Sequence, residues 1–226
     1  YGAPPPDAEA LAACRAMAPR LPDLSAERVA AELTKLLAAP DPVPVLRLMR
    51  AEGVLAQVLD EARDLARLAR MVRIDAAADP LRRLAALLPS DPAGALAVAQ
   101  RLRLSNRDRD RLARMAEGGG PVPDDDAAAR RRALYASGAE GYCDRVLMGW
   151  ASAAGEDGWP ALLRLAEDWT PPRFPLNGGD VMALGIPAGP RVGELLGAVE
   201  AWWVAADFAP DRAACLARLR ENAAAG

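Results

Sequence analysis

The segment Phe174–Leu196 carries the residues of this chain with the clearest chemical potential. Its glycines, proline and arginine predict a tight corner between two helices, with one helix ending at a glycine and the next beginning at a proline: Gly185, Gly189, Pro190 and Arg191. No side chain would then cover the first amides of the second helix, and that end of a helix carries a positive partial charge. Such a helix start beside an arginine could bind a phosphate group. The same residues also fit an ordinary corner whose glycines only meet backbone geometry.

Acidic residues are expected only at helix caps and on solvated faces. Asp180 is predicted to cap the short helix before this corner, because its carboxylate can accept from the free amides of a first turn. Asp124–Asp126 also fall where a helix should begin, and the arginines Arg130–Arg132 follow them. The helix dipole favours carboxylates there, so we interpret them as a helix start and not as a metal site. We expect no catalytic and no metal-ligating residue in this chain.

The composition predicts an almost wholly helical protein. Of the 226 residues, 52% are hydrophobic, and alanine, leucine and arginine dominate while β-branched residues are sparse. We therefore expect an elongated all-α array of about 10–13 helices with no substantial sheet. Trp202 and Trp203 lie on the apolar stripe of the helix expected over 191–208. They are expected in the core, although a tryptophan pair can also stack on bases.

Several classes of protein are excluded by residues that the sequence lacks. It has no histidine, which excludes Ser-His-Asp triads, Cys-His dyads, HExxH zinc sites and histidine-aspartate phosphohydrolases. No apolar run is long enough to span a bilayer, so no membrane partner is expected. Cys14, Cys143 and Cys215 lack metal-ligand spacing and suggest reduced, buried thiols of a cytoplasmic protein.

Any nucleic-acid contact must come from local clusters, because the net charge is −3. Four arginines recur every three or four residues and could line an RNA-facing stripe, with a solvated helix face as the alternative: Arg63, Arg67, Arg70 and Arg73. Gly118–Pro123 is the clearest linker, and residues 222–226 are expected to fray.

Two blocks of the sequence resemble a known family. Leu24–Leu37, followed by Leu46–Met49 and Gly53–Leu55, resembles the neck of the CCA-adding tRNA nucleotidyltransferases, which belong to the poly(A) polymerase family. Pro6–Ala10 is similar to the short lead-in of that block. Phe174–Leu196 resembles the tail of the same family. The resemblance implies a neck-like region over 1–60, a body-like region over 61–120, and a tail-like region over 121–226 with the glycine hairpin at 185–190.

The resemblance also implies chemistry that these residues do not contain. In the family, a head carries paired aspartates after a Gly-Ser turn, which hold Mg²⁺, and a Glu-Asp-x-x-Arg block pairs with the incoming CTP or ATP. Neither motif occurs in this sequence, and the resemblance places both before Tyr1. Mg²⁺ and CTP or ATP are thus expected for the parent enzyme, and no nucleotide addition is expected from this chain alone.

The resemblance implies roles for two groups of residues in this chain. Four match the neck block behind the template helix and would support it: Glu27, Arg28, Glu32 and Lys35. Arg28 and Glu32 stand at i and i+4, so an ordinary surface ion pair is the alternative. The hairpin residues Gly185, Gly189, Pro190 and Arg191 would contact the tRNA backbone, so tRNA and the head in cis are the expected partners.

Two other functions would also fit features of this sequence. The glycine hairpin would also suit a helix-hairpin-helix module that binds DNA. The acidic balance and the alanine-lined helices would also suit a helical protein–protein interaction scaffold.

Overall fold

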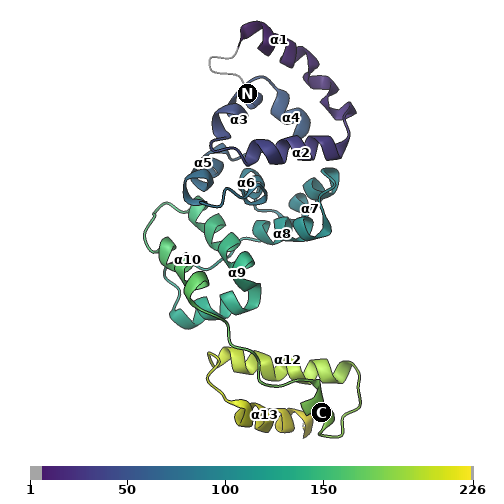
Figure 1. The fold of residues 1–226 in the computed structure, drawn as a ribbon, viewed down its shortest axis with the longest axis vertical. Coiled ribbons are helices and arrows are strands. Elements are labelled where there is room, and N and C mark those ends of the chain that lie inside the picture. The colour runs from purple at the N-terminus through teal and green to yellow at the C-terminus, as the bar shows by residue number, and fades with distance from the viewer. Residues whose placement is uncertain (1–6, 225–226) are drawn as a thin grey trace. The chain divides into compact units, whose positions relative to one another are not determined.

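A computed structural model describes residues 7–224, so Tyr1 and Pro6 lie outside the described residues. The described chain contains thirteen α-helices, one short 3-10 helix and no β-strand, which confirms the all-α prediction (Figure 1). The helices up to the middle of the chain are α1 (Ala8–Met17), η1 (Ala18–Asp23), α2 (Ala26–Leu37), α3 (Val43–Ala51), α4 (Val54–Val58), α5 (Leu65–Ile74), α6 (Pro80–Leu87), α7 (Pro92–Arg101) and α8 (Asn106–Ala116). The remaining helices are α9 (Ala127–Ser152), α10 (Trp159–Asp168), α11 (Gly178–Met182), α12 (Pro190–Ala205) and α13 (Arg212–Ala224). Among these helices none is long and apolar enough to cross a membrane.

Local sequence rules account for most helix boundaries. The Ser25 and Ser105 hydroxyls accept from backbone amides at the starts of α2 and α8, at 3.4 and 3.1 Å, which is the N-cap role that serine favours. Asp126 accepts from the amide of Ala129 at 2.6 Å, which agrees with a carboxylate at a helix start. Gly138 interrupts α9, because its φ of +66° lies in the left-handed region that glycine adopts without strain.

The chain packs into two compact units, each built from two stretches of sequence. Unit 1 comprises residues up to 123 and 140–163, and unit 2 comprises 124–139 and the residues from 164 onward. The segment 118–123 ends at the first of these boundaries, but it packs within unit 1, where Arg145 donates to the Gly119 carbonyl. These two units are defined by packing alone, so they do not test the division into neck-, body- and tail-like regions. That division stays a prediction.

Unit 1 has an apolar core to which α2–α9 contribute. α2 supplies Leu33 and Leu37, which are 6% and 1% exposed, while Val29, Ala30 and Leu36 pack against the same core. This spacing follows the helical period and leaves the polar side chains of α2 on the opposite, exposed face.

A buried ionic network crosses the same unit. Asp144 of α9 accepts from Arg82 of α6 at 2.9 Å and from Arg111 of α8 at 2.6 Å. Arg82 also binds Asp75 at 2.6 Å, and Arg111 binds Asp79 at 2.8 Å. Asp75 and Asp144 are 4% and 2% exposed. The expectation that acidic residues lie only at caps and on solvated faces was therefore wrong, because these two carboxylates are buried among guanidinium partners.

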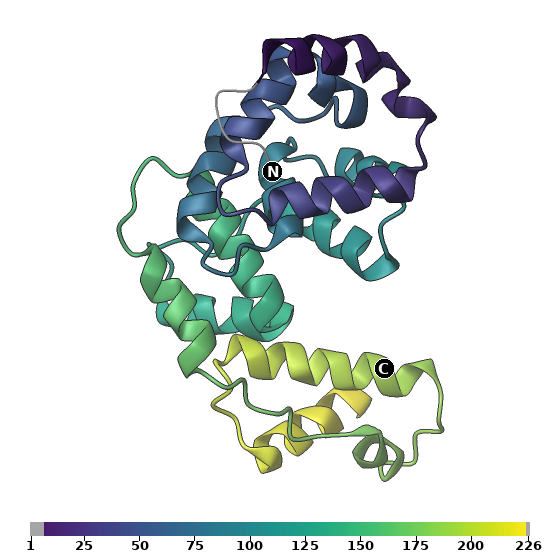
Figure 2. The same cartoon turned by 45° about the horizontal axis from the view of Figure 1, so that its top comes forward.

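Unit 2 is a small helical assembly in which α12 and α13 lie side by side (Figure 2). Trp203 is 3% exposed at the centre of its core and makes an edge-on contact with Tyr135, so the core prediction is confirmed for this tryptophan. Trp202 is half-buried against the same core and lies under the Arg218 guanidinium. α13 continues to Ala224, so the fraying expected from Asn222 was wrong for residues 222–224.

The cysteines differ in burial. Cys215 is fully buried in the core of unit 2, Cys143 is half-buried, and Cys14 is exposed. The expectation of buried thiols was therefore wrong for Cys14, because α1 presents no buried residue within its bounds. None of the three forms a disulfide within residues 7–224.

Candidate nucleic-acid interface

The N-terminus of the short helix α11 is capped by two side chains. The Asn177 side chain accepts from the Gly179 amide at 2.8 Å, while the Asp180 carboxylate accepts from the Asn177 amide at 2.8 Å. This is a capping box in which Asn177 is the N-cap and Asp180 is the third helical residue, so Asp180 takes part in the cap as expected, but its carboxylate accepts from the N-cap amide and not from an amide of the first turn. Asp180 also pairs with Arg212 of α13, and this hydrogen bond holds the pKa of Asp180 below its usual range. These contacts hold α11, the helix before the corner, in place.

On the other side of the corner, the start of α12 is bare. Gly185 has φ +85°, in the left-handed region that favours glycine, and a Cβ added there would meet no atom within 4 Å. Gly189 is the N-cap of α12 and makes no side-chain cap, Pro190 occupies the first turn, and Arg191 is exposed. The predicted corner geometry is confirmed. Phosphate binding there stays a prediction.

The four neck residues lie on the exposed face of α2. Glu27 accepts from the Arg103 guanidinium at 2.7 Å, and its pKa is lowered first by backbone hydrogen bonds and then by Arg103. Glu32 lies 4.0 Å from Lys35, so the ion pair found for Glu32 is not the one considered with Arg28. Arg28 is exposed on the same helix. The structure therefore places these residues on one exposed polar face, and their supporting role stays a prediction.

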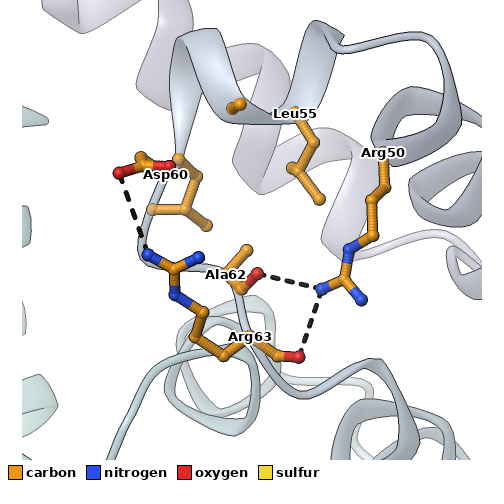
Figure 3. A pocket seen from close by; sticks show the side chains of 7 residues that line it. Arg50, Leu55, Asp60, Ala62 and Arg63 are labelled. Carbon is orange, nitrogen blue, oxygen red and sulfur yellow. Dashed lines mark hydrogen bonds and ion pairs between the residues drawn. The ribbon is translucent and has the colours of Figure 1, made fainter.

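A pocket in the same unit was not anticipated from the sequence. It has a volume of about 340 Å³, and Arg50 and Arg63 lie at its edge (Figure 3). The Arg50 guanidinium donates to the carbonyls of Ala62 and Arg63 at 2.9 and 3.2 Å, and the Arg63 guanidinium lies 3.9 Å from Asp60. Its lining also includes Leu55, Ala56, Leu59 and the acidic residue Asp60. Two cations beside a partly apolar lining suit a nucleotide, which presents a phosphate and the flat face of a base.

The arginine stripe expected over residues 63–73 is divided by the structure. Arg63 and Arg73 have side chains that are 67% and 65% exposed, as a solvated face predicts. Arg67 is half-buried and donates to the Ala86 carbonyl at 2.8 Å and to the Ala85 carbonyl at 3.2 Å. This arginine donates to carbonyls in the last turn of α6, where the regular helical pattern leaves carbonyls without an amide; the Ala85 carbonyl also accepts from the Leu88 amide at 3.2 Å. Periodicity alone could not separate Arg67 from its neighbours.

Comparison with known proteins shows that the first part of the chain is similar to a known family. Residues 6–65 match a family model described as "Probable RNA and SrmB- binding site of polymerase A". This region is similar to the RNA-binding segment of poly(A) polymerases and tRNA nucleotidyltransferases. The chain is also 40% identical over 83 residues to a protein of Rhodospirillum rubrum described as "Uncharacterized 28 kDa protein in petA 5'region". That match covers 33% of this chain and 32% of the relative, so the chain spans about a third of its curated relative's length.

The RNA-binding-like region contains both α2 and the pocket at Arg50 and Arg63. The glycine corner at 185–190 lies outside the matched residues. The structure thus gives two separate candidate surfaces for RNA: one in unit 1 within the matched region, and one in unit 2 at the start of α12.

Proposed function

We propose that this chain is the tRNA-binding part of a CCA-adding tRNA nucleotidyltransferase. The observation that carries the proposal is the match of residues 6–65 to an RNA-binding region, together with the arginine-lined pocket inside it. The resemblance of the tail-like segment Phe174–Leu196 supports the tRNA-specific form of the proposal.

In this proposal the two candidate surfaces contact the phosphates of a folded RNA. Shape recognition of RNA through phosphates and 2′-hydroxyls needs positioned cations and amides and no code of base contacts. Arg50 and Arg63 provide such cations in unit 1, and Arg191 beside the bare start of α12 provides one in unit 2. Because the net charge is −3, binding would depend on these local clusters.

The neck residues would hold the catalytic part of the whole enzyme. Glu27, Arg28, Glu32 and Lys35 would support, from behind, the helix that pairs with CTP or ATP. The parent would transfer CMP and AMP to the 3′ end of tRNA with Mg²⁺ held by paired aspartates of a head in cis. Two-metal phosphoryl transfer needs clustered carboxylates on a rigid element, so we expect this chain alone to bind tRNA without extending it. A cytoplasmic location belongs to the same proposal.

Filter binding of tRNA and of duplex DNA to the 226-residue chain, over a range of salt concentrations, tests the proposal. We expect preferential retention of tRNA with a salt dependence of only a few phosphate contacts. Arg191→Glu should weaken tRNA retention by about fivefold to tenfold and lower the salt slope by about one. Arg164→Glu, which changes an exposed arginine of α10 in the same unit, is the matched control and should have little effect.

Each contrary result has a defined meaning. Preference for duplex DNA would favour the helix-hairpin-helix interpretation, and retention of neither nucleic acid would favour the scaffold. Equal tRNA retention by Arg191→Glu and Arg164→Glu would show that the corner does not contact RNA.

A further inference from the structure

Unit 1 contains a second cavity, separate from the pocket at Arg50. Its volume is about 220 Å³, and it lies between the glycine segment after α8 and the second half of α9. The polar groups along it come from five places in the chain: Arg67, Ser90, Gly118–Gly120, Arg145 and Ser152. No carboxylate lines it among the described residues.

The first cation of this cavity has neutral partners only. The Arg67 guanidinium donates to the main-chain carbonyls of residues 85, 86 and 88 and to the Ser90 hydroxyl oxygen, the last at 3.4 Å. The Asp64 carboxylate is occupied as the N-cap of α5, where it accepts from the Arg67 backbone amide at 2.8 Å. Burial lowers the pKa of Arg67, and the charge of Asp64 offsets part of this effect. The guanidinium is thus held rigidly, without a bonded carboxylate.

The second cation also lacks a carboxylate partner. Arg145 donates to the Gly119 carbonyl, and its Nε is buried without a hydrogen-bond partner among the described residues. A buried donor that stays unpaired costs free energy unless another acceptor reaches it. The cavity therefore brings together two guanidinium groups whose charge no acidic side chain neutralises there.

The glycine segment packs closely against the main chain of α9 at Arg145. Gly118 and Gly119 have φ +70° and +61°, and a Cβ at Gly120 would lie 2.8 Å from the Arg145 carbonyl oxygen. Glu117 is right-handed and Gly118 left-handed, a succession in which backbone amides can converge on an anion. None of the amides of Gly118–Gly120 donates a backbone hydrogen bond within residues 7–224.

We infer that this cavity binds a phosphate group. A phosphate offers several strong acceptors and a negative charge, which suit two guanidinium groups, a serine hydroxyl and unpaired amides. Ser90 accepts from Arg67, so its own hydroxyl hydrogen can be donated to such a ligand. The phosphate would come from an RNA backbone or from a free phosphate. Only the first of these sources rests on the proposed function.

Phosphorus-31 NMR titration of the 226-residue chain with inorganic phosphate tests this inference. The native chain should show saturable binding at millimolar phosphate or below. Arg145→Gln should weaken it by about tenfold, the loss expected for a charge-assisted hydrogen bond. Arg107→Gln removes the same charge from a side chain that is 76% exposed outside the cavity, and it should leave binding unchanged. Ser90→Glu alters an exposed residue and should abolish binding by placing a carboxylate beside Arg67.

The outcomes separate the inference from its alternatives. Circular dichroism establishes whether each variant remains folded. If Arg145→Gln unfolds, the phosphate affinity of Ser90→Glu tests the inference instead. Displacement of phosphate by a single-stranded oligoribonucleotide would identify the RNA backbone as the source, and failure to displace it would identify free phosphate. Absence of saturable binding, or equal affinity in the folded variants, would overturn the inference. Phosphate binding without any tRNA retention would instead overturn the proposed function and leave this site standing.

Discussion

Replacing Asp144 with asparagine removes the central charge of the buried network in unit 1 while keeping the size of the side chain. The Asp144 carboxylate accepts four hydrogen bonds, two from Arg82 at 2.9 and 3.0 Å and two from Arg111 at 2.6 and 2.7 Å. Its side chain is 3% exposed, so water cannot replace these partners.

The expected cost follows from the charges that remain. Breaking a buried ion pair by removing one partner typically costs about 3–5 kcal/mol. Before the substitution three carboxylates face two guanidinium groups. Afterwards Asp75 still binds Arg82 and Asp79 still binds Arg111, so neither cation is left alone. We therefore expect a loss near the lower limit, about 3 kcal/mol, or a fall in the melting temperature of unit 1 of roughly 6–12 °C.

Urea unfolding followed by circular dichroism measures this loss, and Glu140→Gln provides the control. Glu140 lies at the rim of the same network, 3.8 Å from Arg111 and 3.0 Å from Arg107, with a side chain that is 50% exposed. Its neutralisation should cost about 0–1 kcal/mol, because exposed pairs are screened by water. If Asp144→Asn proves no more costly than Glu140→Gln, the network does not stabilise the fold in the way described.

Acid should lower the stability of unit 1 by protonating Asp79. Burial, the largest influence, raises the pKa of Asp79, but hydrogen bonds from the Arg82 amide and from Arg111 outweigh it and hold the pKa below its usual 3.8. This contribution to stability is present above pH 3.8 and disappears as the pH falls through the lowered pKa. The urea midpoints of the native chain and of Asp79→Asn should therefore converge in acid. A difference between the two midpoints that stays constant with pH would contradict this. Gly185→Ala should cost about 1–2 kcal/mol, because φ is +85° there. Gly193→Ala, within α12 and with open space around it, should stabilise by about 0.5–1 kcal/mol, and thermal unfolding that ranks the two alanines the other way would refute the assigned backbone. Ser25→Ala should cost about 0.5–1 kcal/mol through loss of the α2 cap, and an unchanged melting temperature would show that this long hydrogen bond contributes nothing.

Elements fixed by neighbouring residues could be predicted from the sequence. The serine caps of α2 and α8, the break at Gly138 and the proline at the start of α12 all depend on side chains within a few positions of the backbone they satisfy. The cap of α11 shows how far this local logic extends. Asn177 and Asp180 are both good capping residues, and the pattern alone did not show that they act together.

Features that depend on distant residues were missed for a physical reason. Arg82 and Asp144 are separated by 62 positions, and nothing local distinguishes Asp144 from a solvated aspartate on an amphipathic helix. Arg67 looks like its exposed neighbours until the end of α6 is brought against it. The pocket at Arg50 arises in the same way, because its carbonyl partners at residues 62 and 63 become neighbours only when α3 packs beside the start of α5.

The candidate RNA surfaces combine both kinds of residue. The bare start of α12 follows from Gly189 and Pro190, and it was predicted together with Arg191. The pocket at Arg50 and Arg63 requires the folded unit, and only the family match attaches an RNA-binding role to its part of the chain.

Amide hydrogen exchange with and without tRNA tests whether both candidate surfaces contact tRNA, because it reports both of them in one measurement. We expect slower exchange on tRNA binding around residues 50–63 and 185–193, with little change on the buried face of α5. Unchanged exchange at both surfaces under conditions in which tRNA is bound would contradict it.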